Sequence, residues 1–113
     1  MNNITTRRKV KIRTRAGWLF VDPESILFFI AKANSCCAIL RNGDETDISL
    51  EMKELERKFS TFFRINDDLL INLRYLDKVS NQISGYVSVN NSYRFPIDND
   101  RKMLLLNALN EFC

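Results

Sequence analysis

Turn-forming residues recur at short intervals along the chain and limit the length of every regular element between them. Ala16-Gly17, Asp22-Pro23, Asn42-Gly43 and Asn90-Asn91 each interrupt a run of apolar or alternating residues. Gly and Asn accept the positive φ angles of tight turns, and Pro lacks the amide donor that a strand or helix needs. The spacing therefore predicts many short strands instead of a few long elements.

The segments between these turns have the patterns of β-strands. Residues 10–21 alternate apolar and polar side chains, as in a hairpin, whereas residues 25–33 (SILFFIAKA) are apolar without alternation and predict a buried strand. Residues 36–50 predict two strands joined by a turn, and residues 62–79 contain two apolar runs separated by polar side chains. Residues 83–97 predict a second hairpin.

Helical periodicity is present in two segments. The first is SLEMKELERKF, in which Met52, Leu55 and Phe59 fall on one face and acidic residues precede basic ones, as the helix dipole favours. Ser49 is expected to be its N-cap.

The second helix follows Asp98, which can cap it. Its inner stripe is predicted to comprise Leu105, Ala108, Leu109 and Phe112. Strands, one short helix, more strands and a closing helix predict a mainly β, antiparallel fold with two short helices, not a doubly wound one.

The chain has the size of one domain, with 113 residues of which 45% are hydrophobic. Eight Phe, three Tyr and one Trp are enough for one core, and a second core is not expected. We expect a flexible N-terminal arm at residues 1–7 and a single domain at residues 8–113.

The composition excludes several kinds of catalytic and metal site. There is no His, so a Ser-His or Cys-His pair cannot form, and the three Gly are not spaced as a phosphate-binding loop. Asp67 and Asp68 are adjacent, and adjacent strand residues point to opposite faces. We therefore expect a protein without enzymatic activity, metal, cofactor or small-molecule substrate.

Cysteine usage and the absence of long apolar runs indicate a cytoplasmic protein. Cys36, Cys37 and Cys113 are an odd number, which favours buried free thiols over a disulfide framework. The longest apolar run, residues 26–31, is much shorter than the roughly 20 residues of a membrane-spanning helix. No signal peptide pattern precedes it.

Basic residues are concentrated near the start of the chain. Residues 7–15 contain six of the 17 Lys and Arg residues and no acid, whereas the rest of the chain has a net charge of −3. Such a segment attracts phosphate, although a solvated edge strand protected by its charges has the same composition.

Three motifs in order resemble the LytTR family of bacterial DNA-binding domains. The segment FFRINDDLLINLRYLDKV follows the helix SLEMKELERKF as the family's F-x-R motif follows its own helix. Upstream, SILFFIAKANSCCAIL is similar to the family's strand pair, and downstream YRFPIDNDRKMLLLNAL is similar to its last helix. The resemblance covers residues 8–112. It implies a strand-rich fold that inserts loops into successive major grooves of duplex DNA, as a transcription regulator that binds paired repeats as a dimer.

The resemblance also implies three DNA-contacting regions, at residues 32–37, 64–68 and 94–102. The residues carried over are Lys32, Asn34, Ser35, Cys36, Arg64, Asn66, Asp67, Arg94, Asn99, Arg101 and Lys102. Some of them have structural alternatives: Arg64 could pair with a helix acid, and Arg101 and Lys102 could lie on a solvated helix face. Packing is favoured for Cys36, and backbone bonding at a turn for Asn72.

The chain departs from the family pattern at the expected DNA surface. Asn66-Asp67-Asp68 stands where the family has His-Arg-Ser, and Asp98-Asn99 where it has Ser-Arg. Carboxylates repel phosphates, although an Asp can accept a hydrogen bond from cytosine N4. The alternative function is therefore a LytTR-like fold that has lost DNA binding and serves as a protein-interaction module.

Overall fold

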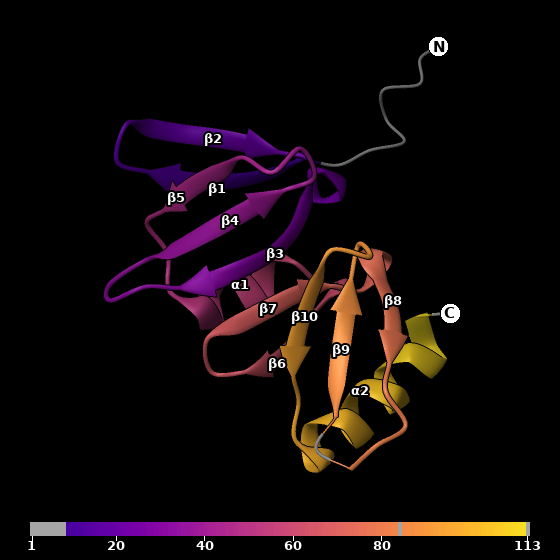
Figure 1. Cartoon of the computed structure of the whole chain (residues 1–113). Coiled ribbons are helices and arrows are strands. Elements are labelled where there is room, and N and C mark those ends of the chain that lie inside the picture. The colour runs from indigo at the N-terminus through magenta and orange to yellow at the C-terminus, as the bar shows by residue number, and fades with distance from the viewer. Residues whose placement is uncertain (1–8, 84, 113) are drawn as a thin grey trace.

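The computed structural model describes residues 9–83 and 85–112, which form ten strands, two α-helices and two short 3₁₀ helices (Figure 1). The predicted arm at residues 1–7, Cys113 and the side chain of Phe112 lie outside this description. In chain order the elements are β1 (Val10–Thr14), β2 (Gly17–Val21), a 3₁₀ turn (Pro23–Ser25), β3 (Ile26–Ala31), β4 (Cys36–Leu40), β5 (Glu45–Ile48), α1 (Met52–Lys58), β6 (Phe62–Asn66), β7 (Leu69–Asn72), a 3₁₀ turn (Leu73–Tyr75), β8 (Leu76–Val79), β9 (Tyr86–Val89), β10 (Tyr93–Pro96) and α2 (Asn99–Phe112).

The strands form three antiparallel sheets, which confirms the predicted mainly β fold with two helices. The central sheet has five strands in the order β5-β4-β3-β7-β6. The β1–β2 hairpin lies beside its β5 border, and the three-stranded sheet β10-β9-β8 lies with α2 on the other side (Figure 1).

The turns have the geometry that their residues favour. Asn90 and Asn91 both have positive φ, 55° and 54°, and join β9 to β10 as expected of an Asn-Asn hairpin turn. At the β4–β5 turn the Asn42 side chain accepts the Asp44 amide at 2.9 Å. The predicted hairpins and their turn positions are therefore confirmed.

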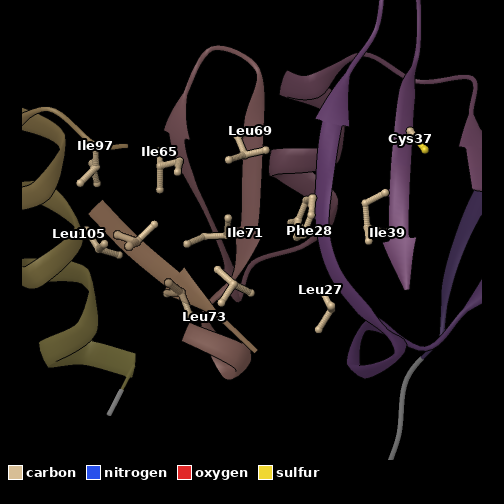
Figure 2. Packing of buried hydrophobic residues seen from close by; sticks show 12 residues of the cluster. Leu27, Phe28, Cys37, Ile39, Ile65, Leu69, Ile71, Leu73, Ile97 and Leu105 are labelled. Carbon is tan, nitrogen blue, oxygen red and sulfur yellow. The ribbon is translucent and has the colours of Figure 1, made fainter. Parts of the chain in front are cut away.

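Buried side chains form two clusters on opposite faces of the central sheet, so the expectation of one core is wrong. The α2-side cluster, shown in Figure 2, consists of Leu27, Phe28, Cys37, Ile39, Ile65, Leu69, Ile71, Leu73, Val87, Val89, Ile97 and Leu105. The α1-side cluster consists of Ile12, Ile26, Phe29, Cys36, Ala38, Ile48, Met52, Leu55, Phe59, Phe62 and Leu70.

Strand alternation distributes neighbouring residues between the two clusters. Cys36 and Ala38 of β4 belong to the α1-side cluster, whereas Cys37 and Ile39 belong to the α2-side cluster. Successive side chains of a strand point to opposite faces, so a strand covered on both faces must be apolar throughout. This explains the continuous apolar runs of the central strands.

The first helix begins later than expected. α1 starts at Met52 with Glu51 as the N-cap, and the Glu54 carboxylate accepts the Glu51 amide at 3.3 Å. Ser49 instead donates its amide to the Arg13 carbonyl at 3.3 Å, which ties the end of β5 to β1. The predicted Ser49 cap is therefore wrong, whereas the buried positions Met52 and Leu55 are confirmed.

The second helix begins as predicted. The Asp98 carboxylate accepts the Arg101 amide at 2.8 Å, and the Asp98 carbonyl accepts the Lys102 amide at 2.9 Å. Leu105 is fully buried, and Leu109 packs against the same cluster. Figure 2 shows Leu105 and Ile97 on the α2 side of that cluster.

Candidate nucleic-acid interface

Two of the three predicted regions flank one end of the central sheet, and the third reaches it through its helix. Because β3 and β7 are antiparallel, the β3–β4 loop (residues 32–35) and the β6–β7 turn (residues 67–68) leave the sheet together, and the Ala31 amide donates to the Asp68 carbonyl at 2.9 Å. The start of α2 joins them, since Arg101 donates a side-chain hydrogen bond to the Arg64 carbonyl of β6. We call this the loop end of the sheet (Figure 1).

The β3–β4 loop is a tight turn with exposed polar side chains. The Lys32 amide donates to the Ser35 carbonyl at 2.8 Å, which closes the turn. The Lys32 side chain is 52% exposed, with its Nζ 3.9 Å from an Asp47 oxygen. Asn34 is exposed and Ser35 is half-buried. The loop therefore presents an ammonium, an amide and a hydroxyl.

Cys36 does not belong to this exposed set. It is the first residue of β4, is fully buried and packs in the α1-side cluster. Burial raises the pKa of the Cys36 thiol above its ordinary value, which keeps the sulfur protonated at neutral pH. The packing role favoured from the sequence agrees with this position, and direct contact with a base does not.

The β6–β7 turn is shaped by its own side chains. The Asn66 side chain accepts the Asp68 amide at 2.8 Å, and the register shifts by one residue between Arg64 and Asn66. Arg64 donates to the Asp67 carbonyl at 3.0 Å. Asn66, Asp67 and Asp68 are all exposed, so two carboxylates stand at the tip of this turn.

Two arginines from separate elements line one surface cavity at the loop end. The cavity, of about 390 Å³, is bordered by Glu56, Arg64, Asn66, Asp67, Asp98 and Arg101. An Arg64 terminal nitrogen lies 3.5 Å from a Glu56 oxygen, and the Arg101 guanidinium lies 5.1 Å from the centre of the Phe63 ring. Arg64 therefore does pair with an acid of α1, as the structural alternative proposed.

These arginines keep donor capacity that the protein does not use. The Nε atoms of Arg64 and Arg101 are buried and have no hydrogen-bond partner in the described chain. A buried donor without a partner is costly, and a planar guanidinium is well matched to phosphate or to the guanine edge. Because these Nε atoms are buried, a ligand in the cavity would have to bind the terminal nitrogens of the two arginines instead.

Lys102 is not at this surface, although the sequence placed it there. It is 6% exposed, and its ammonium donates to the carbonyls of Ser80 at 3.0 Å and Gln82. It secures the segment between β8 and β9. The spacing could have revealed this position, since Lys102, Leu105 and Leu109 follow the i, i+3, i+7 pattern of an inner helix face.

Arg94 and Asn99 lie apart from the cavity. Arg94 is exposed on β10, with its guanidinium 4.2 Å from the centre of the Tyr86 ring on β9. A hydrogen bond with Lys78, together with the charge of Arg94, lowers the pKa of Tyr86. Asn99 is exposed at the first position of α2. Neither residue borders the cavity that Arg64 and Arg101 share.

Sequence reasoning missed Phe63, which positions Arg101, and it expected a helix acid beside Arg64 without specifying which one. Phe63 supports the Arg101 guanidinium, and Glu56 pairs with Arg64. The signal for Glu56 was present, because it is one of the helix acids considered for Arg64. Nothing in the alternation of β6 identifies Phe63 as a support for a residue of α2.

Comparison with known proteins identifies the same fold. A family model described as the LytTr DNA-binding domain matches residues 16–110. The LytTr DNA-binding domain of a Bacillus cereus protein described as a methyl-accepting/DNA response regulator has a similar structure, with a TM-score of 0.73 and 17% identity over 91% of this chain and 97% of that one. No curated protein matches the sequence.

In the described part of the chain no helix is long and apolar enough to span a membrane.

Proposed function

Because the chain belongs to the LytTR family of DNA-binding domains, we propose that it binds duplex DNA by inserting the loop end of its central sheet into successive major grooves. One observation carries the proposal: Arg64 and Arg101, from β6 and α2, border the same cavity at the loop end. The proposed role is that of a cytoplasmic transcription regulator that binds without catalysis.

The exposed loop residues divide into two kinds of contact. Lys32, Asn34 and Ser35 carry donors suited to phosphate oxygens, which position a protein on the duplex without reading sequence. Arg101 presents a guanidinium that can bind guanine O6 and N7 with two hydrogen bonds. In this proposal the β3–β4 loop contacts mainly the backbone, and the start of α2 contacts bases.

The carboxylates at the loop end change the expected sequence preference. Asp67 is exposed at the β6–β7 turn, where the family pattern has an arginine. A carboxylate can accept from cytosine N4 but is repelled by phosphate. We therefore propose that the β6–β7 turn favours a cytosine and that it contributes little to non-specific binding.

Binding to paired repeats as a dimer is part of the same proposal. It predicts that a duplex with two half-sites one helical turn apart binds two copies more tightly than two separate half-site duplexes do. Sedimentation of the protein alone and with each duplex would measure this. Equal affinity per half-site, with a monomer on every duplex, would contradict the paired mode.

A second candidate function is protein interaction at the same surface. Glu56, Asp67 and Asp98 border the cavity together with two arginines, so carboxylates outnumber cations there. A protein partner with both donors and acceptors would suit this mixture better than a polyanion. The same DNA-binding experiment separates the two candidates.

The experiment is a salt titration of DNA affinity. For the wild type the logarithm of the association constant should fall linearly with the logarithm of salt, by about 0.9 for each phosphate neutralised. Arg101→Ala should weaken binding by about 1–3 kcal/mol. Arg74→Ala removes an exposed arginine at the other end of β7 and should leave affinity unchanged.

Circular dichroism of each variant establishes that it is folded. Absence of binding by folded wild-type protein to any duplex of a randomised pool, at low salt and micromolar concentration, would overturn the DNA-binding proposal and favour the protein-interaction one.

A further inference from the structure

The tip of the β1–β2 hairpin lies at the loop end, next to the β3–β4 loop. Ser49 donates its amide to the Arg13 carbonyl at 3.3 Å, and Ile48 pairs with Cys36 at the start of β4. A surface groove of about 580 Å³ is bordered by Arg15 and Ala16 of the tip, and also by Asn34 and Ser35 of the loop. Figure 1 shows the β1–β2, β3–β4 and β6–β7 turns along the same side of the molecule.

This hairpin carries cations that no acid neutralises. Lys11, Arg13 and Arg15 are exposed, and none of them takes part in an ion pair within the described residues. Lys11 pairs across the hairpin with Phe20, and Arg13 with Trp18. The Lys11 ammonium lies 4.9 Å and the Arg13 guanidinium 5.8 Å from the centre of the Trp18 ring.

The β1–β2 hairpin that carries these cations is anchored to the rest of the domain. Ile12, between them in sequence, is fully buried in the α1-side cluster. At the tip the Thr14 hydroxyl donates to the Gly17 carbonyl at 3.1 Å, and Gly17 has a φ of 140°, which favours glycine. A cationic group placed in advance loses less entropy when it binds than one on a free arm.

We propose that the β1–β2 tip is a fourth DNA-contacting element, in which Arg13 and Arg15 bind backbone phosphates of the same duplex beside the β3–β4 loop. This inference rests on the proposed function. The charge of the surface favours a polyanion as the occupant. Within the described residues Arg13 and Arg15 form no ion pair, and Asp47, the only acid that borders the groove, already lies 3.9 Å from Lys32. The tip shares a groove with Asn34 and Ser35 of the β3–β4 loop. The phosphates that it binds are therefore expected to lie beside the base pairs that the other loops contact.

The test compares two duplex lengths. The first is a duplex that the wild type selects from a randomised pool, with about ten flanking base pairs on each side, and the second is the same duplex trimmed to the bases that the selection fixes. The variant Arg13→Ser/Arg15→Ser should lower the salt slope on the long duplex by about 1.8, for two lost phosphates. On the trimmed duplex the variant and wild type should have equal slopes.

The matched control is Arg57→Ser/Lys58→Ser, which removes two exposed cations from the last turn of α1. Lys58 borders a groove with Asn72, at the end of β7 away from the loops. Arg15→Ser alone, which leaves the contacts of Trp18 in place, should lower the slope by about 0.9. A variant slope equal to that of the wild type on the long duplex would overturn the inference. Failure of the wild type to bind any duplex would overturn the proposed function itself.

Trp18 provides an independent measurement, since it is the single tryptophan and is 58% exposed. Bound long duplex should reduce quenching of its fluorescence by acrylamide, and the trimmed duplex should leave quenching as in the free protein. Unchanged quenching with the long duplex under saturating conditions would contradict a contact at this face.

Discussion

The two ends of the β6–β7 hairpin differ in how they use an asparagine. Asn72, at the end away from the loops, is 1% exposed and donates to the carbonyls of Pro23 at 3.2 Å and Ile26 at 2.9 Å. It also accepts the Arg74 amide at 2.9 Å. One side chain thus joins β7 to a segment that lies 46 to 49 residues earlier.

Asn66, across the hairpin at the loop end, is exposed and accepts the amide of Asp68 in its own turn. The same residue type therefore joins distant segments at one end and shapes a local turn at the other. Stability and binding are therefore expected to depend on different ends of the strands, so substitutions at the two ends should affect different properties of the domain.

The largest expected effect is that of Asn72→Ala. It leaves buried carbonyl and amide groups without partners, and we expect the free energy of unfolding to fall by about 2–3 kcal/mol. Asn66→Ala, the matched variant at the loop end, should cost less than about 1 kcal/mol. Urea unfolding measures both, and equal losses would contradict the division between the two ends.

Lys102→Ala should come next, with a loss of about 1.5–3 kcal/mol of unfolding free energy, because a charged donor to two carbonyls is removed. DNA affinity and its salt slope should remain those of the wild type. A slope lowered by about 0.9 with unchanged stability would instead place Lys102 on the DNA.

Asp67→Arg should affect affinity and not stability. Removal of a carboxylate and addition of a cation at the β6–β7 turn should raise affinity for duplex DNA roughly tenfold at low salt. Asp44→Arg makes the same change at the β4–β5 turn, which lies at the other end of the sheet, and should have little effect. Equal affinities for the two variants would place Asp67 off the interface.

The smallest effect concerns the thiols. Burial raises the folded-state pKa of Cys36 and Cys37, so their contribution to stability is complete below the ordinary thiol pKa of about 8.5 and declines as pH rises above it. Cys36→Ala should therefore flatten the alkaline fall in unfolding free energy, and Ser35→Ala should not. Identical alkaline slopes for wild type and Cys36→Ala would contradict a buried neutral thiol.

Local patterns were sufficient to predict the strands, the hairpin turns and both helices. Asn90-Asn91 and Asn42-Gly43 determine their turns through their own φ preferences, and Asp98 caps α2 through a bond to a residue three positions away. These interactions join residues that are close together in the sequence, so the local sequence is enough to predict them.

The errors involve contacts between distant segments. Ser49 is a typical N-cap residue, but in the structure its amide donates to the Arg13 carbonyl, and this contact holds Ser49 beside β1 instead of at the start of α1. The structure has two clusters instead of the expected single core, because both faces of the central sheet are covered. This covering depends on where β1 and α2 pack, which the local sequence does not determine. At the candidate site, the family pattern indicated Arg64 and Arg101, but their common cavity arises only from the packing of α2 on β6.

Arg101 also contacts the border of the central sheet. Its side chain donates a hydrogen bond to the Arg64 carbonyl of β6, which is a border strand. On the β5 border the Arg13 carbonyl takes the Ser49 amide in a comparable way. Exposed borders allow sheets from different molecules to join and aggregate. We therefore expect α2 and the β1–β2 hairpin to limit edge-to-edge association of this sheet, and we expect a fragment that lacked either of them to associate more readily.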